Sequence, residues 1–225
     1  MSWLITPRLQ GVTTDGLVLN LDAGQPSSYL KGSQWLDLSG NGNHATLINS
    51  PTFNSANGGN LGFNGTNQYI SFGTPIVLSP ATGFTIEVWQ YIVVPQTSNT
   101  WNYFWAEGPS GFEIGSYFTS APGFEFKDTG TAGTPSVGTA RVDAWQHIMF
   151  GCDQRKPFFY ANSVYSTNAN LYRNTNLSIS LLNRSQPSNS GYYKANQAII
   201  RMYNRALTYP EVNHNFSATR SRFGV

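Results

Sequence analysis

The feature that most constrains the fold is a series of short β-type runs that recurs along the whole chain. Each run is rich in β-branched or aromatic residues and is bounded by Gly, Pro, Asn or Ser, a pattern typical of strands joined by tight turns. Runs with this regular spacing predict an all-β jelly-roll sandwich of antiparallel sheets. They read GLVLNL, QYISF, FTIEVWQYIVV, NYFWAEG, GFEIGSYF, GFEFKD, WQHIMFGCD, KPFFYANS, NLSISLLN and QAIIRMYN.

The run at residues 84–92 shows the alternation of a strand most clearly. Phe84, Ile86 and Val88 fall on one face of an extended chain, whereas Glu87 and Trp89 fall on the other. The pattern predicts a half-buried strand with one face in the core and a wetter second face.

One short helix is predicted near the C-terminus. Thr208 and Glu211 have the spacing of a capping box, and Pro210 stands in the first turn, where its missing N–H costs nothing. Val212 and Phe216 lie four residues apart and give the helix an apolar edge that can dock on the sandwich.

The length and composition indicate one large β domain with an uncharged polar surface. We expect an N-terminal arm or edge segment at residues 1–16 and a single domain at residues 17–225. Only 11% of the residues are charged, well below the roughly 25% that is usual, and such surfaces suit packing into an assembly or contact with sugars. The formal net charge of +2 is too small to predict binding to nucleic acid.

Several classes of protein do not fit the sequence. Cys152 is the single cysteine, so the chain has neither a disulfide framework nor a thiolate metal cluster. The first residues lack the pattern of a secretory signal peptide. The sequence contains no run of about eighteen apolar residues, so we expect no insertion into a membrane.

Three stretches, in this order, carry a resemblance to a known family. They are WLDLSGNGNHATLINSPTFNSANGGNLGFNGTNQYISF, then FTIEVWQYI with WQHIMFGCD, then IIRMYNRALTYPEVNHNF. Together they resemble the laminin-G-like members of the concanavalin A-like lectin/glucanase superfamily, over about Leu17 to Phe223. The resemblance implies a jelly roll of two antiparallel sheets. The functions of the superfamily's members range from glycan binding through glycoside hydrolysis to structural packing.

Two shorter stretches suggest a finer assignment. Chains with GLVLNLDAG near the start and a terminal RFG resemble virion-associated proteins of tailed bacteriophages. This resemblance implies a place on the exterior of a phage particle, contacts with other virion proteins, and a homo-oligomer such as a trimer.

The stretch LDLSGNGNHATL, at residues 36–47, begins like a calcium-binding loop. Asp37 and Asn41 take the first and fifth positions of an EF-hand register, but the twelfth position holds Ile48 where a bidentate Glu is required. Asn and Gly are also the residues that tight turns demand. A structural turn is therefore the favoured interpretation, and a Ca²⁺ site at Asp37 and Asn41 is the alternative.

Two aromatic groups are candidates for glycan binding. Trp101, Tyr103 and Trp105 have the spacing of one strand face, while Tyr192 and Tyr193 lie in a second segment that reads as a loop. The residues between the first three include a phenylalanine, so a central strand buried on both faces is the competing interpretation, and the one we favour for that run.

No enzymatic chemistry is predicted. Glycoside hydrolysis needs two carboxylates close together, yet Glu87, Glu113 and Glu125 each stand alone in a strand. None of the three histidines lies in a recognisable nucleophile context. Glycoside hydrolysis is kept only as a remote alternative, because carboxylates from separate strands can converge.

The leading functional hypothesis is a non-enzymatic structural protein on the exterior of a phage particle. It would decorate the capsid or belong to a tail or fibre appendage, with surface adhesion as an added role. The alternative hypothesis is a lectin module that recognises host surface polysaccharide.

Overall fold

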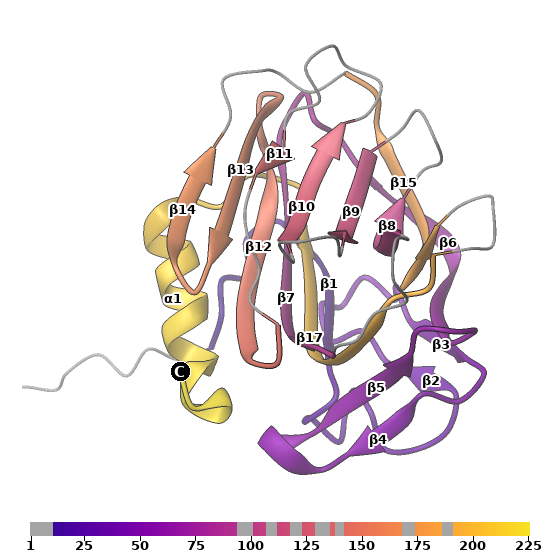
Figure 1. Ribbon diagram of the computed structural model, residues 1–225. Helices are drawn as coiled ribbons and strands as arrows, with labels where there is room; N and C mark the ends of the chain where they lie inside the picture. Colours follow the sequence, from indigo (N-terminus) through magenta and orange to yellow (C-terminus); the bar gives the residue numbers. More distant parts are fainter. Residues whose placement is uncertain are drawn as a thin grey trace, which may run out of the picture.

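The computed structural model describes residues 11–93, 101–106, 112–117, 123–128, 136–137, 142–167, 174–185 and 191–225. In these ranges the chain forms two layers of mainly antiparallel strands and one short C-terminal α-helix (Figure 1). The predicted all-β class is confirmed.

The first layer is a sheet of eight strands whose neighbours all pair in the antiparallel sense. Seven of them follow one another across the sheet, and β1 (Leu17–Asp22) pairs with the fifth of these. In spatial order the seven are β14 (Val164–Thr167), β13 (Lys156–Ala161), β12 (Trp145–Asp153), β7 (Phe84–Ile92), β17 (Lys194–Tyr203), β5 (Asn60–Asn64) and β4 (Thr52–Asn54).

The second layer consists of two hydrogen-bonded sheets, where the sequence predicted one. One has the order β11 (Ser136–Val137), β10 (Gly123–Asp128), β9 (Phe112–Tyr117), β8 (Trp101–Ala106) and β16 (Arg184–Ser185). The other has the order β15 (Leu177–Leu182), β6 (Tyr69–Leu78), β3 (Ala45–Ile48) and β2 (Gln34–Trp35). The chain crosses from β15 to β16 at Asn183, whose φ of 67° turns the backbone away from β6. As a result β16 pairs with β8 in parallel.

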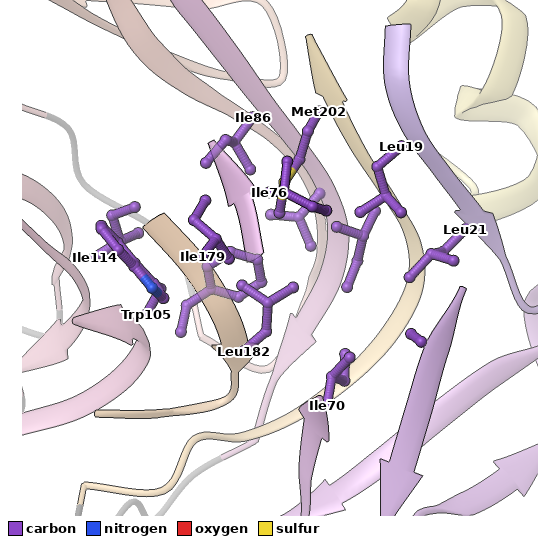
Figure 2. Close-up of a cluster of buried hydrophobic side chains, with 14 of the residues drawn as sticks. Leu19, Leu21, Ile70, Ile76, Ile86, Trp105, Ile114, Ile179, Leu182 and Met202 are labelled. Atoms are coloured by element: carbon purple, nitrogen blue, oxygen red, sulfur yellow. The ribbon is translucent and has the colours of Figure 1, made fainter. Parts of the chain in front are cut away.

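The core fills the space between the two layers. Figure 2 shows Ile86 and Met202 of the large sheet directed into the same interior as Trp105 and Ile179 of the second layer. All four side chains are fully buried. Each such side chain contributes about 1.5–3 kcal/mol through the hydrophobic effect, so this cluster supplies the main driving force for folding.

The outer face of the large sheet is covered at β7, where the sequence predicted a wetter face. Strand β7 is buried on both faces because α1 (Tyr209–Thr219) and the 3₁₀ helix η2 (Arg220–Phe223) pack over it. The Trp89 ring stacks on Phe223 with centroids 4.1 Å apart, and its Nε1 donates to Thr219 Oγ1 at 2.8 Å. The prediction of a wetter face on β7 is therefore wrong.

Helix α1 itself begins as predicted. The backbone N–H of Thr208 donates to Glu211 Oε2 at 2.8 Å, and Pro210 lies in the first turn. Val212 is buried against the outer face of the sheet. Among the described residues, no helix combines the length and the apolar character that crossing a bilayer requires.

The two terminal motifs GLVLNLDAG and RFG contact each other in space. Arg222 Nη1 lies 2.6 Å from Asp22 Oδ1, and Arg222 Nη2 donates to the carbonyl of Gly59 at 2.6 Å. A Cβ atom at Gly24 would collide with the Gly58 carbonyl and with the Arg222 guanidinium, so only glycine fits there. Both motifs thus serve to close the fold. The remaining short helix, η1 (Ala56–Gly58), lies beside η2.

Candidate functional site

The predicted calcium residue Asp37 holds a turn through hydrogen bonds. Its Oδ1 accepts the backbone N–H groups of Asn20 and Ser39, both at 2.8 Å. Its Oδ2 accepts the Ser39 hydroxyl at 2.7 Å and the N–H of Asn43 at 3.0 Å. Four donors therefore use the four acceptor positions of one carboxylate, and a metal ion would have to displace them.

Asn41 extends the same turn. Its side-chain Nδ2 donates to the carbonyl of Leu17 and to the hydroxyl of Ser39, both at 3.0 Å, which ties the loop to the start of β1. Gly40 and Gly42 both have positive φ, 88° and 74°. No group of three or more His, Cys, Asp or Glu side chains placed to hold a metal ion occurs in the described part of the chain. The geometry of residues 36–47 favours the structural turn.

Strand β8 does not present its aromatic residues on one face. A bulge between Tyr103 and Trp105 breaks the alternation, so Phe104 and Trp105 both enter the core. Tyr103 is half-buried, and burial, together with the carboxylate of Glu113, raises its pKa to about 12. The side chain of Trp101 lies outside the described residues. The favoured interpretation, a strand buried on both faces, agrees with the burial of Phe104 and Trp105, and the alternative of an exposed ring is wrong for Trp105.

The two tyrosines of the second candidate group point to different surroundings. Tyr193 is fully buried, with its ring 6.3 Å from Phe104. Tyr192 is only partly buried, and its ring lies 6.4 Å from that of Tyr69. The guanidinium of Arg184 covers the Tyr69 ring at 4.5 Å. We call Tyr69, Tyr192 and Arg184 the rim patch. Only Tyr192 of this patch was predicted.

A buried polar cluster under α1 has the residue types of a catalytic site without access to solvent. Glu87 is fully buried and accepts hydrogen bonds from Arg201 Nη1 at 2.7 Å and Asn215 Nδ2 at 2.9 Å. Its Oε1 also lies 2.9 Å from His147 Nε2. Burial by itself raises the pKa of Glu87, but the charge of Arg201 and the bonds from His147 and Asn215 lower it to about 2. The cluster fastens the helix to the sheet.

A solvent-open pocket of about 330 Å³ lies beside the start of α1, and the sequence did not predict it. Phe158 and Tyr160 of β13 form its nearly buried floor, and Tyr165 of β14 is half-exposed at its side. The Tyr160 and Tyr165 rings are 5.0 Å apart. Tyr209, the first residue of α1, stacks beside Tyr160 at 6.2 Å. We call this the tyrosine pocket.

Polar groups surround the aromatic floor. Asp153 is exposed, and the hydroxyl groups of Thr82 and Thr208 line the same pocket. Arg205 also lines it, but its Nη2 lies 2.6 Å from Glu211 Oε1 and its Nε 2.8 Å from Asp15 Oδ2. The bond from Arg205 is the main reason that the pKa of Glu211 falls to about 2. Each of the three guanidinium nitrogens of Arg205 thus already donates to an oxygen of Asp15, Ala206 or Glu211, which leaves no unused nitrogen of this side chain for an anionic ligand.

A local sequence pattern, a two-residue hairpin loop, accounts for the pairing of Tyr160 with Tyr165. Tyr160 and Tyr165 lie opposite each other in the β13–β14 hairpin, whose two-residue loop is Asn162–Ser163. Both loop residues have positive φ, 47° and 69°, as the tight turn that favours such hairpins requires. Tyr209 joins them because α1 docks beside β13, and no local pattern indicates that position.

Comparison with known proteins assigns the chain to a family. The family model Laminin_G_3, described as concanavalin A-like lectin/glucanases superfamily, matches residues 64–213. No curated protein sequence matches the chain.

Three solved structures share the fold at low sequence identity. The binding domain of Paraclostridial Mosquitocidal Protein 1 is 16% identical with a TM-score of 0.65, over 91% of this chain and 52% of that one. The Botulinum Neurotoxin Type G receptor binding domain is 16% identical with a TM-score of 0.61, over 91% and 51%. Domain 4 of AbnA, a GH43 extracellular arabinanase from Geobacillus stearothermophilus, in complex with arabinotriose, is 18% identical with a TM-score of 0.60, over 87% and 96%. The chain spans about half the length of the first two structures.

Proposed function

The chain belongs to the concanavalin A-like lectin/glucanases superfamily, and we propose that it is a non-enzymatic, glycan-binding protein on the exterior of a bacteriophage particle. The fold is lectin-like, and structures that share it include receptor-binding and carbohydrate-bound domains. Fold alone does not choose a ligand, so the proposal depends on the site.

The observation that carries the proposal is the tyrosine pocket. Sugars bind to proteins by stacking their apolar faces on aromatic rings while hydroxyl and carboxylate oxygens accept their O–H groups. Tyr160 and Tyr165 supply the rings, and Asp153 and Thr208 supply oxygens at the same opening. Because every guanidinium nitrogen of Arg205 already donates to a protein oxygen, a neutral sugar fits this pocket better than an acidic one.

The same pocket supports a binding role without hydrolysis. Among the described residues that line it, Asp153 is the single carboxylate. Glycoside hydrolysis needs two carboxyl groups about 5–10 Å apart across the scissile bond. Glu87, which has His147 beside it, is sealed under α1 and does not reach this pocket. Binding and release is therefore the activity we propose.

The placement on a phage particle depends on the resemblance of GLVLNLDAG and RFG to virion-associated proteins. The low content of charged residues, 11%, supports it, because uncharged polar surfaces pack readily against neighbouring proteins. Other virion proteins, and further copies of this chain in a trimer, are the partners we propose. Host surface polysaccharide is the ligand.

An array of neutral and acidic oligosaccharides, probed with the purified protein with and without calcium, tests the proposed function. We expect binding to neutral glycans, unchanged by calcium, and no release of sugar on long incubation. Binding that requires calcium would move the site to the Asp37 turn. Release of reducing sugar would replace the proposal with an enzyme, and the absence of any bound glycan would remove the lectin role.

The second candidate function is a purely structural one. Leu30 and Val164 are exposed by 77% and 72%, respectively, and apolar side chains at such positions suit a protein interface. If the chain is only a building block, it binds no glycan, and particles assembled without it lose a layer of density or fall apart.

A further inference from the structure

A second pocket, of about 300 Å³, lies where β1 meets the end of α1. Asn20 and Asp22 of β1 line it, together with Gln25, Arg201 of β17, and Ala218 near the end of the helix. It shares no lining residue with the tyrosine pocket. We call it the arginine pocket.

The donor groups of Arg201 are only partly used. The side chain is 4% exposed; its Nε donates to Asn20 Oδ1 at 3.1 Å and its Nη1 to Glu87 Oε1 at 2.7 Å. Its Nη2 has no hydrogen-bond partner within the described ranges, yet it is not sealed from solvent. A buried guanidinium with two free N–H groups is costly unless an acceptor oxygen meets it. Arg201 therefore presents an unmet donor pair to the pocket.

The other polar groups of the arginine pocket determine which hydrogen-bonding groups a ligand must carry. In the described structure the Nδ2 of Asn20 and the side-chain amide of Gln25 have no partner, so they add neutral donors. Asp22 Oδ1 is occupied by Arg222 at 2.6 Å and by the N–H of Gly24 at 2.9 Å, whereas its Oδ2 has no partner there. The side chains of the pocket thus offer several donors and two acceptors that are unused in the described structure, Asp22 Oδ2 and Gln25 Oε1.

Charge narrows the ligand further. Arg201 is paired with Glu87, and Asp22 with Arg222, so the positive and negative charges around the pocket balance. A doubly charged anion gains little in such a place, whereas a singly charged carboxylate accepts a charge-assisted hydrogen bond from the unused Nη2 of Arg201. A ligand hydroxyl can donate to Asp22. A volume of about 300 Å³ is at the lower end of ligand pockets and suits one small molecule.

We infer that the arginine pocket binds a hydroxycarboxylic acid the size of one sugar ring, of the hexuronic acid type, through Arg201, Asn20 and Gln25. This site goes beyond the proposed function, because the tyrosine pocket takes neutral sugars and lies among other residues. It gives the protein a second, acid-selective contact.

Calorimetric titration of the whole protein with glucuronate tests the inference, with glucose, acetate and sulfate as the compared probes. We expect saturable binding of glucuronate and at least about tenfold weaker binding of each other probe. Glucose lacks the carboxylate, acetate lacks the hydroxyl groups, and sulfate carries two charges. Equal binding of glucose or of sulfate would overturn the inference, and so would the absence of saturation by glucuronate.

Single-residue variants test whether glucuronate binds in the arginine pocket. Ala218→Trp fills the pocket from the exposed helix surface, and Gln25→Ala removes an amide that bonds to nothing else in the described structure. We expect Ala218→Trp to abolish glucuronate binding and Gln25→Ala to weaken it several-fold, while thermal unfolding stays as in the wild type. Arg201→Lys keeps the charge beside Glu87 but loses the planar donors, and should bind about tenfold more weakly. Unchanged binding by Ala218→Trp would overturn the assignment. Tyr165→Ala, in the tyrosine pocket, is the control and should bind glucuronate normally.

Discussion

Glu87 and Arg201 form an ion pair of 2.7 Å inside the protein, with exposed fractions of 0% and 4%. The pair joins β7 to β17, and Asn215 of α1 donates to the same carboxylate at 2.9 Å. The cluster therefore fixes the helix on the outer face of the sheet. Ala218 at the end of the helix lines the arginine pocket, and the N-cap residue Thr208 lines the tyrosine pocket.

Removing the charge of Glu87 should destabilise the fold strongly. Glu87→Gln leaves the Arg201 guanidinium buried without its anion, and breaking such a pair costs about 3–5 kcal/mol in the free energy of unfolding. Urea unfolding measures this loss. Glu211→Gln is the comparison, because its partner Arg205 is partly exposed and such pairs contribute about 0–1 kcal/mol. Equal losses for the two variants would contradict the role of the buried cluster.

The same carboxylate makes stability depend on pH in the acid range. The pKa of Glu87 is about 2 in the folded protein, whereas an ordinary glutamate titrates near 4.5. Because the folded pKa is the lower one, the stabilisation is complete above about pH 4.5 and is lost as pH falls towards 2. We expect the urea concentration at the unfolding midpoint to fall more steeply between pH 6 and pH 2 for the wild type than for Glu87→Gln, when it is measured at intervals of about one pH unit. Parallel curves would show that Glu87 is not the group responsible.

Asp37 should matter for stability and not for metal binding. Asp37→Ala removes the acceptor of three backbone N–H groups, those of Asn20, Ser39 and Asn43, and should cost at least about 2 kcal/mol. Calcium or a chelator should leave the melting temperature of the wild type unchanged. A calcium-induced rise in melting temperature that disappears in Asp37→Ala would identify a metal site there.

Cys152 should be chemically inert while the protein is folded. Its side chain is fully buried on β12, and burial raises the pKa of its thiol to about 12. A thiol reagent such as a maleimide should react only after unfolding in denaturant. Stoichiometric labelling of the native protein within minutes would mean that this part of β12 opens readily.

Local patterns were enough to predict ten of the seventeen strands of the described structure and the start of the helix, whereas short strands such as β2, β11 and β16 were missed. Turn residues bound each strand, and Thr208 and Glu211 form the capping box within four residues of chain. The structural turn at Asp37 was also accessible, because its geometry depends on Asn and Gly close by in sequence.

Features that depend on distant packing were not predictable in the same way. The bulge that turns Trp105 into the core arises from the pairing of β8 with β9. The burial of Glu87 and Trp89 requires α1 and η2, more than 120 residues later in the chain, to fold back over β7. The tyrosine pocket combines a hairpin and a helix end for the same reason.

Calorimetric titration of a neutral oligosaccharide selected from the array, into the wild type and three tyrosine variants, tests the central claim most directly. Tyr165→Ala should weaken binding by about 1–3 kcal/mol, because it removes a ring that lines the tyrosine pocket. Tyr209→Ala should weaken binding less, because Tyr209 does not line the pocket and only stacks beside Tyr160. Tyr192→Ala, in the rim patch, should bind as the wild type does. Loss of affinity in Tyr192→Ala with none in Tyr165→Ala would contradict the account and place the glycan at the rim patch.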